Sequence, residues 1–216
     1  MALDCGVARA EHWDEAYASR GIVGVSWFQA VPAVSLELVE SLGIESDVAV
    51  LDVGGGGSTF AGELVRRGFD DITVLDFSAT ALEATKSRLP AGAPVQLVRA
   101  DLLDWEPDRA YGLWHDRAVF HFLVESGDRL RYVTRMRTAL ASGGAVIVAT
   151  FADDGPETCS GLPVLRYSAA DLVAELGEGF TRVETTREEH VTPRGAVQPF
   201  TWVAGYVPSS GSQPSR

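Results

Sequence analysis

The sequence predicts a doubly wound α/β fold, in which helices cover both faces of a mostly parallel sheet. From residue 48 onward, apolar runs of strand length alternate with segments of helical periodicity. Near the C-terminus, two more strand candidates, 180–191 and 196–207, are joined by a turn too short for a crossover helix, so they should form an antiparallel hairpin. The other predicted strands are 48–53, 71–77, 95–100, 111–115 and 145–151, and the helices between or after them are 60–67, 79–89, 129–140 and 169–176.

Two helices are predicted before the first strand. In the segment 11–20, Trp13, Ala16 and Tyr17 share one helical face, and 34–42 is an amphipathic helix that ends near Gly43. We therefore expect residues 1–46 to form a helical lid and lead-in, and 47–207 to form the main domain in one globular unit with it. Residues 208–216 have the low hydrophobicity of a disordered tail.

Composition restricts the partners. The chain of 216 residues has 18 basic and 30 acidic side chains and a net charge of −12, which disfavours sequence-independent binding to nucleic acid or to an anionic membrane. It has no apolar run long enough for a membrane span and no leader pattern, so we expect a cytoplasmic protein, monomeric or weakly dimeric. Cys5 and Cys159 lack metal-binding spacing, and we expect neither a metal nor a disulfide.

A run of four glycines, Gly54 to Gly57, directly follows the first predicted strand, and Asp52 lies two residues before the first of them. A loop without side chains lets a ligand lie on the backbone, and the helix after it offers free N–H donors. Asp76, about 20 residues further on, has the spacing of an acid that binds a ribose diol. Asp101 closes the third predicted strand in the same way. Because carboxyl ends of parallel strands meet at one edge of the sheet, these acids predict a nucleoside site.

The acid before the glycines argues against a dinucleotide. Asp52 would repel a pyrophosphate but would attract a ligand that carries an ammonium and a sulfonium. Thr59 also replaces the third glycine of the G-x-G-x-x-G pattern. A methyl-donor nucleoside is therefore favoured over NAD.

The run Leu51-Asp52-Val53-Gly54-Gly55-Gly56 resembles motif I of the class I S-adenosylmethionine-dependent methyltransferases. Leu75-Asp76-Phe77-Ser78 and Ala100-Asp101-Leu102 are similar to the acidic strand ends that follow it in that family. The resemblance covers residues 13–206 and implies a Rossmann-like sheet of seven strands, with the last inserted antiparallel. It also implies methyl transfer from S-adenosylmethionine, with S-adenosylhomocysteine as product. The implied cofactor contacts are the methionine part on Asp52, Gly54, Gly55 and Gly56, the ribose on Asp76 with Phe77 and Ser78, and the adenine beside Asp101 and Leu102.

The segment 114–120 carries a narrower resemblance. It is similar to the Asp-Arg-Gly-Ala segment of the thiopurine S-methyltransferases, with Ala118 in place of the glycine and His115 before Asp116. Asp116 with a small residue nearby also resembles the Asp-Lys-Gly-Thr segment of a group of protein lysine methyltransferases. In the thiopurine enzymes two N-terminal aromatics close over the cofactor. The residues matched to this lid here are Trp13, with Tyr17 on the same helical face, and Trp27 or Phe28.

Three residues at the end of the fourth predicted strand are candidates for catalysis. His115 has a near-neutral reference pKa and should face the crevice, so it is the first candidate base, and His121 is the second. Asp116 and Arg117 either form a salt bridge or polarise a substrate. By the thiopurine resemblance, Arg117 lies near the substrate, where it would hold a partly anionic acceptor.

The favoured function is methyl transfer from S-adenosylmethionine to a small molecule with a thiol, amine or hydroxyl acceptor. The alternatives left open are a protein lysine methyltransferase, a nicotinamide-dependent reductase and a non-catalytic cofactor-binding module. The loop 153–163 follows the fifth predicted strand and should border the acceptor side of the pocket.

Overall fold

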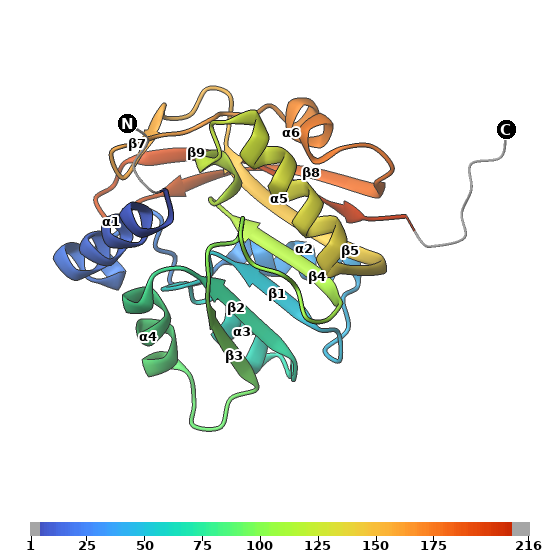
Figure 1. Ribbon diagram of the computed structural model, residues 1–216, viewed down its shortest axis with the longest axis horizontal. Helices are drawn as coiled ribbons and strands as arrows, with labels where there is room; N and C mark the ends of the chain where they lie inside the picture. Colours follow the sequence, from blue (N-terminus) through green and yellow to red (C-terminus); the bar gives the residue numbers. More distant parts are fainter. Residues whose placement is uncertain (1–4, 209–216) are drawn as a thin grey trace, which may run out of the picture.

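A computed structural model describes residues 5–208, with side chains from residue 11 onward (Figure 1). At its centre is a seven-stranded sheet in the order β3-β2-β1-β4-β5-β9-β8. The strands β1 to β5 pair in parallel, and β9 is antiparallel to both of its neighbours. The predicted doubly wound sheet with an inserted antiparallel strand is thus confirmed. The strand bounds are β1 Val50–Val53, β2 Ile72–Asp76, β3 Val95–Arg99, β4 Tyr111–Arg117, β5 Leu140–Phe151, β8 Thr181–Val191 and β9 Val197–Tyr206.

Helices cover both faces of this sheet. The helices α2 (Ala33–Leu42) and α3 (Phe60–Arg66) lie behind it in Figure 1, whereas α5 (Ser126–Ala139) and α6 (Ala169–Leu176) lie in front. Each pair shares a separate hydrophobic cluster with the strands. At one end of the sheet, α1 (Cys5–Arg20) packs beside α4 (Ala79–Arg88).

Side-chain alternation along β1 and β4 decides which residues point to each face of the sheet. Leu51 and Trp114 point into the cluster that contains α5, so Asp52 and His115, one residue later, point to the opposite face with α2 and α3. Asp52 and His115 are also register partners on adjacent strands. The sheet therefore places a carboxylate and an imidazole side by side beneath the glycine loop.

The structure differs from the prediction in a few elements. β4 continues to Arg117, and β5 begins at Leu140, directly after α5. Within the predicted loop 153–163, β6 (Thr158–Cys159) and β7 (Leu162–Pro163) form a small hairpin. Two 3-10 helices, Ile22–Gly24 and Phe120–Phe122, follow α1 and β4 respectively. Apart from Pro208, the predicted disordered tail lies outside the described residues.

Candidate functional site

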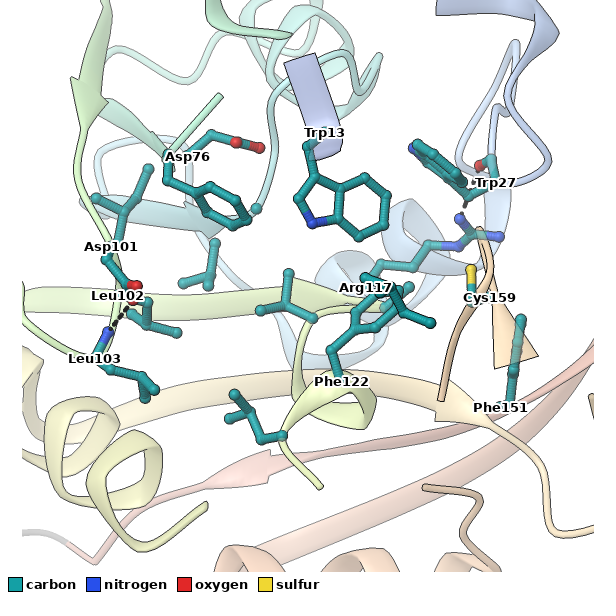
Figure 2. A pocket seen from close by; sticks show the side chains of 18 of the residues that line it. Trp13, Trp27, Asp76, Asp101, Leu102, Leu103, Arg117, Phe122, Phe151 and Cys159 are labelled. Atoms are coloured by element: carbon teal, nitrogen blue, oxygen red, sulfur yellow. Dashed lines mark hydrogen bonds between the residues drawn. The ribbon is translucent and has the colours of Figure 1, made fainter. Parts of the chain in front are cut away.

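A cavity of about 290 Å³ opens where the parallel strands end (Figure 2). In Figure 2, Asp76 and Asp101 lie at one end of it, Arg117, Phe151 and Cys159 lie at the other, and Trp13 lies between them. The residues that line it and bear on the argument are Trp13, Tyr17, Trp27, Gly54, Asp76, Phe77, Asp101, Leu102, Leu103, Arg117, Phe122, Phe151, Cys159, Gln198 and Phe200.

The glycine loop passes so close to other groups that only backbone fits. A Cβ atom on Gly55 would lie 2.1 Å from Oδ2 of Asp52, and one on Gly56 would lie 2.5 Å from Oδ2 of Asp76. Gly54 has a positive φ of 62°, and a Cβ there would lie 2.1 Å from Cγ2 of Val119. The loop thus has room for backbone alone, and its role in holding a ligand stays a prediction.

Asp76 ends β2 at the cavity wall. Its Oδ2 accepts a hydrogen bond from the Gly56 N–H at 3.0 Å, and its Oδ1 accepts one from the Ser78 N–H at 2.8 Å. Burial raises the pKa of Asp76 to about 6, although these two donors favour its charged form. Phe77 lines the cavity as well.

Ser78 does not face the cavity, contrary to its predicted cofactor role. Its hydroxyl accepts from the Ala81 N–H at 3.0 Å and so caps α4, and it donates to Asp14 of α1 at 2.6 Å. The side chain links two helices.

Asp101 and Leu102 both line the cavity near the end of β3. One oxygen of Asp101 accepts from the Leu103 N–H at 2.9 Å and stabilises the turn after the strand. Leu102 and Leu103 are buried beside it, so the Asp101 carboxylate has two apolar side chains as neighbours. This combination suits the flat face and the polar edge of an adenine.

Aromatic side chains from α1 and the segment after it cover the cavity. The ring of Trp13 lies edge-on to Trp27 at 5.2 Å and to Phe122 at 5.1 Å. The Tyr17 hydroxyl donates to the Gly56 carbonyl at 2.9 Å and accepts from Nε1 of Trp27 at 3.2 Å. The lid is thereby hydrogen-bonded to the glycine loop. Trp27, not Phe28, lines this cavity.

His115, predicted as a base, does not line this cavity; it lines a smaller cavity of about 40 Å³ beneath the glycine loop. Its Nδ1 lies 2.7 Å from Oδ1 of Asp52, its Nε2 lies 2.9 Å from Oγ of Ser35, and its ring stacks on Phe60 at 3.9 Å. Both ring nitrogens are therefore engaged with protein groups. Alternation along β4 puts His115 on the same side of the sheet as Arg117, but two residues earlier, where Ser35 of α2 and Phe60 of α3 cover the ring.

Asp116 is a structural residue of the turn after β4. Its carboxylate accepts from the N–H groups of Val119 and Phe120 and from the Tyr132 hydroxyl, at 2.8, 3.0 and 2.6 Å. Burial raises its pKa to about 6. Asp116 supports Ala118, whose φ is 74°, and it neither lines the cavity nor pairs with Arg117. Its predicted catalytic role does not fit this position.

Arg117, in contrast, reaches the cavity. Its Nη1 donates to the Trp27 carbonyl at 3.0 Å, its Nε lies 3.8 Å from Oε2 of Glu188, and its guanidinium lies 4.5 Å from the centre of the Phe200 ring. Nη2 has no hydrogen-bond partner among the described residues. Burial lowers the pKa of this guanidinium to about 10, which leaves it a cation at neutral pH.

The second candidate base, His121, is also a buried structural residue. Its Nδ1 accepts from the Phe151 N–H at 3.3 Å, and burial together with Arg117 lowers its pKa to about 3. Such an imidazole is neutral at physiological pH.

Several residues of the cavity could not be predicted from local sequence patterns. Phe122, Phe151 and Phe200 come from a 3-10 helix, β5 and β9, and only the fold brings them together. Cys159 lies at the same end of the cavity as a free thiol whose pKa is raised by burial to about 12.

In residues 5–208, no helix has the length and apolar character to cross a membrane, and no cluster of three His, Cys, Asp or Glu side chains offers a metal site.

Comparisons with known proteins agree with this geometry. Residues 50–144 match the family described as a methyltransferase domain. Human EEF1A lysine methyltransferase 2 is 33% identical over 190 residues, which are 81% of this chain and 75% of that protein. Trans-aconitate 2-methyltransferase of Rhizobium etli is 38% identical over 100 residues, which are 45% of this chain and 36% of that protein.

A solved structure extends the similarity to nearly the whole fold. The 1,6-didemethyltoxoflavin-N1-methyltransferase of Burkholderia thailandensis, solved with S-adenosylhomocysteine, superposes with a TM-score of 0.67 over 96% of this chain and 92% of that one, at 16% identity. This superposition shows that the two chains share a fold, and the sequence matches show the family. The chain belongs to the class I S-adenosylmethionine-dependent methyltransferases, with S-adenosylmethionine as its cofactor.

Proposed function

We propose that this enzyme methylates a small anionic acceptor, bound at the end of the cavity that contains Arg117, Phe122, Phe151, Cys159 and Phe200. Membership of the methyltransferase family excludes the alternative of a nicotinamide-dependent reductase. The proposal therefore concerns the acceptor of the methyl group. The aromatic lid closes over the cavity, and its acceptor end is lined almost entirely by apolar side chains. A concave and largely apolar site of this kind suits a small molecule.

The cofactor end of the cavity fits S-adenosylmethionine. We assign the ribose hydroxyls to Asp76, the adenine to Asp101 with Leu102, and the methionine part to Gly54, Gly55 and Gly56. Phe77 adds an apolar wall, and the lid residues Trp13, Tyr17 and Trp27 cover the nucleoside. Steric crowding around Gly55 and Gly56 supports this assignment, because a Cβ at either position would overlap the Asp52 or the Asp76 carboxylate and displace it.

The observation that carries the acceptor class is the buried cation of Arg117. Its Nη2 has no partner in the described part of the chain, and a buried unpaired donor has a free-energy cost that an acceptor anion would remove. A protonated amine at the same place would be repelled by the guanidinium.

The rest of the acceptor end agrees with an anion as the nucleophile. S-adenosylmethionine supplies a methyl group already activated on a sulfonium, so the protein must align the acceptor and exclude water. Asp76 and Asp101, at the other end, are the only carboxyl groups that line the cavity in the described chain, and no histidine lines it. An oxygen or sulfur that is already an anion needs no base, because its electron pair forms the new bond to the methyl carbon without loss of a proton, while the bond from that carbon to the sulfonium breaks and S-adenosylhomocysteine leaves as a neutral thioether.

Two relatives point to different acceptors. The human protein is named as a lysine methyltransferase, whereas the Rhizobium etli protein acts on trans-aconitate, a small anion. Arg117 favours the second kind of acceptor. Lysine methylation is therefore the second candidate, supported by the longer sequence match.

Methyl transfer to a panel of small carboxylates, phenols and thiols, with amines and purified EEF1A beside them, tests the proposal. We expect turnover with members of the anionic set. Arg117→Gln should lower kcat/KM for that acceptor by about tenfold or more through loss of a charge-assisted contact, and by more than it lowers S-adenosylhomocysteine affinity, since Arg117 also donates to the Trp27 carbonyl of the lid. Arg135→Gln removes an arginine paired with Glu106 outside the cavity and is the matched control. Turnover of amines or EEF1A alone would contradict the anionic acceptor.

A further inference from the structure

Beneath the glycine loop, three buried polar side chains form a hydrogen-bonded chain. Oγ of Ser35 lies 2.9 Å from Nε2 of His115, and Nδ1 of His115 lies 2.7 Å from Oδ1 of Asp52. Their exposed fractions are 1%, 2% and 1%, respectively. A carboxylate only accepts, so Nδ1 carries a proton and donates to Asp52, while Nε2 is free to accept from the serine hydroxyl.

Three elements hold this chain in place. Asp52 and His115 are register partners on β1 and β4, and Ser35 comes from the first turn of α2. Phe60, the first residue of α3, stacks on the imidazole and fixes the plane of the ring. The direction of the Asp52 carboxylate is thus set by Ser35 and His115, neither of which lines the larger cavity.

The other oxygen of Asp52 is free. Oδ2 has no hydrogen-bond partner among the described residues, although it is buried. It lies against Gly55, where a Cβ would come within 2.1 Å. A second cavity of about 40 Å³, lined by Asp52, Gly54, Gly55 and Arg117 among others, lies at this point. A buried, half-satisfied carboxylate has a free-energy cost, which a ligand cation would offset.

We propose that Ser35 and His115 are positioning residues for the cofactor: they hold Asp52 so that its free oxygen and its charge attract the α-ammonium of the amino-acid end. His115, expected from the sequence to be a base, then acts on binding and not on proton removal. Neither residue contacts the acceptor.

Two substitutions at one position separate the two hydrogen bonds. The amide nitrogen of Asn stands near the place of Nδ1, so His115→Asn keeps a donor for Asp52, whereas His115→Gln puts its amide near Nε2 and loses that donor. Both variants lose the stacking on Phe60 equally. The ligands are S-adenosylhomocysteine and 5′-methylthioadenosine, which shares the nucleoside and thioether but has no ammonium or carboxylate. Calorimetric titration measures each affinity, and thermal unfolding reports on the fold.

We expect His115→Gln to bind S-adenosylhomocysteine about tenfold more weakly or worse and His115→Asn to lose about threefold or less, with methylthioadenosine affinity unchanged in both. An equal loss for both ligands, or no loss in His115→Gln, would overturn the proposal. Should His115→Gln fail to fold, Ser35→Ala tests the proposal in its place: it should weaken binding of S-adenosylhomocysteine and leave methylthioadenosine affinity unchanged. No acceptor is present in this assay, so an error in the proposed acceptor class does not affect its result.

Discussion

Single residues of the glycine loop can be tested by adding one methyl group. A Cβ at Gly55 would overlap Asp52, whereas a Cβ at Gly62, in the middle of α3, would meet its nearest heavy atom at 3.8 Å. The same substitution therefore has opposite effects at the two sites.

Gly55→Ala is expected to destabilise the protein by about 1–3 kcal/mol and to weaken S-adenosylhomocysteine binding, because Asp52 or the loop must move. Gly62→Ala should stabilise it by about 0.5–1 kcal/mol, since alanine is the better helix former and the site has room. Thermal unfolding and calorimetric titration measure both. A Gly55→Ala variant that binds the ligand as tightly as the wild type would show that the loop does not cradle it.

The raised pKa of Asp76 predicts a pH dependence of cofactor binding. The ionised carboxylate accepts hydrogen bonds from ribose hydroxyls, and with a pKa of about 6 it is ionised only above that pH. Affinity for S-adenosylhomocysteine should therefore fall toward tenfold per pH unit below about 6. In the ligand-free protein the sign is opposite: a raised carboxyl pKa makes this group's contribution to stability fall as the pH rises from about 4 to about 6.

Titration calorimetry between pH 5 and 8 measures the first effect. Asp116 also has a raised pKa, so Asp76→Asn is the control: its weaker binding should not change over this range. A flat profile for the wild type would remove the ribose role from Asp76.

Among the elements, α1 connects the lid to the cofactor site at two points. Asp14 accepts from the Ser78 hydroxyl at 2.6 Å and from the Thr80 N–H at 3.1 Å, at the start of α4. One turn later, Tyr17 bonds the Gly56 carbonyl. Because Ser78 also donates its N–H to Asp76, the position of the helix is linked to the acid that we assign to the ribose.

Asp14→Ala is expected to loosen α1, since two hydrogen bonds are lost at about 1 kcal/mol each. Hydrogen exchange of residues 5–20 should quicken, and S-adenosylhomocysteine affinity should fall several-fold. Glu15→Ala removes the same charge from an exposed neighbour and should change neither quantity. Unchanged exchange in Asp14→Ala would show that Tyr17 and the aromatic contacts hold the helix without it.

The element scale also shows what the sequence could and could not predict. Periodicity and glycine spacing are enough to predict the strands, the terminal hairpin and the position of Asp76 and Asp101 at the strand ends that border the cavity. Alternation along β4 predicts the side of the sheet on which His115 lies. Its contact with Asp52 depends on the pairing of β4 with β1, which the sequence alone does not show. Phe151 and Phe200 meet across β5 and β9, a long-range pairing that no local pattern contains.

At the scale of the whole molecule, the lid and the lead-in helix α2 belong to different hydrophobic clusters. Tyr17 and Val25 form a small cluster beside α4, with Trp27 packed against it. Leu36 and Leu42 of α2, in contrast, belong to the main cluster behind the sheet. The predicted lead-in 1–46 thus joins a cover for the site to a helix of the core.

This difference predicts that two truncations have different outcomes. Removal of residues 1–30 deletes Trp13, Tyr17 and Trp27 but keeps α2, so the remaining chain should still unfold cooperatively while binding S-adenosylhomocysteine at least about tenfold more weakly. Removal of residues 1–46 also deletes four buried aliphatic side chains, Leu36, Leu38, Val39 and Leu42. At about 1.5–3 kcal/mol each, their burial is comparable to a typical total stability of about 5–15 kcal/mol. The shorter chain should therefore lack a cooperative thermal transition by circular dichroism. A cooperative transition in it would instead place the domain boundary after α2, at residue 46.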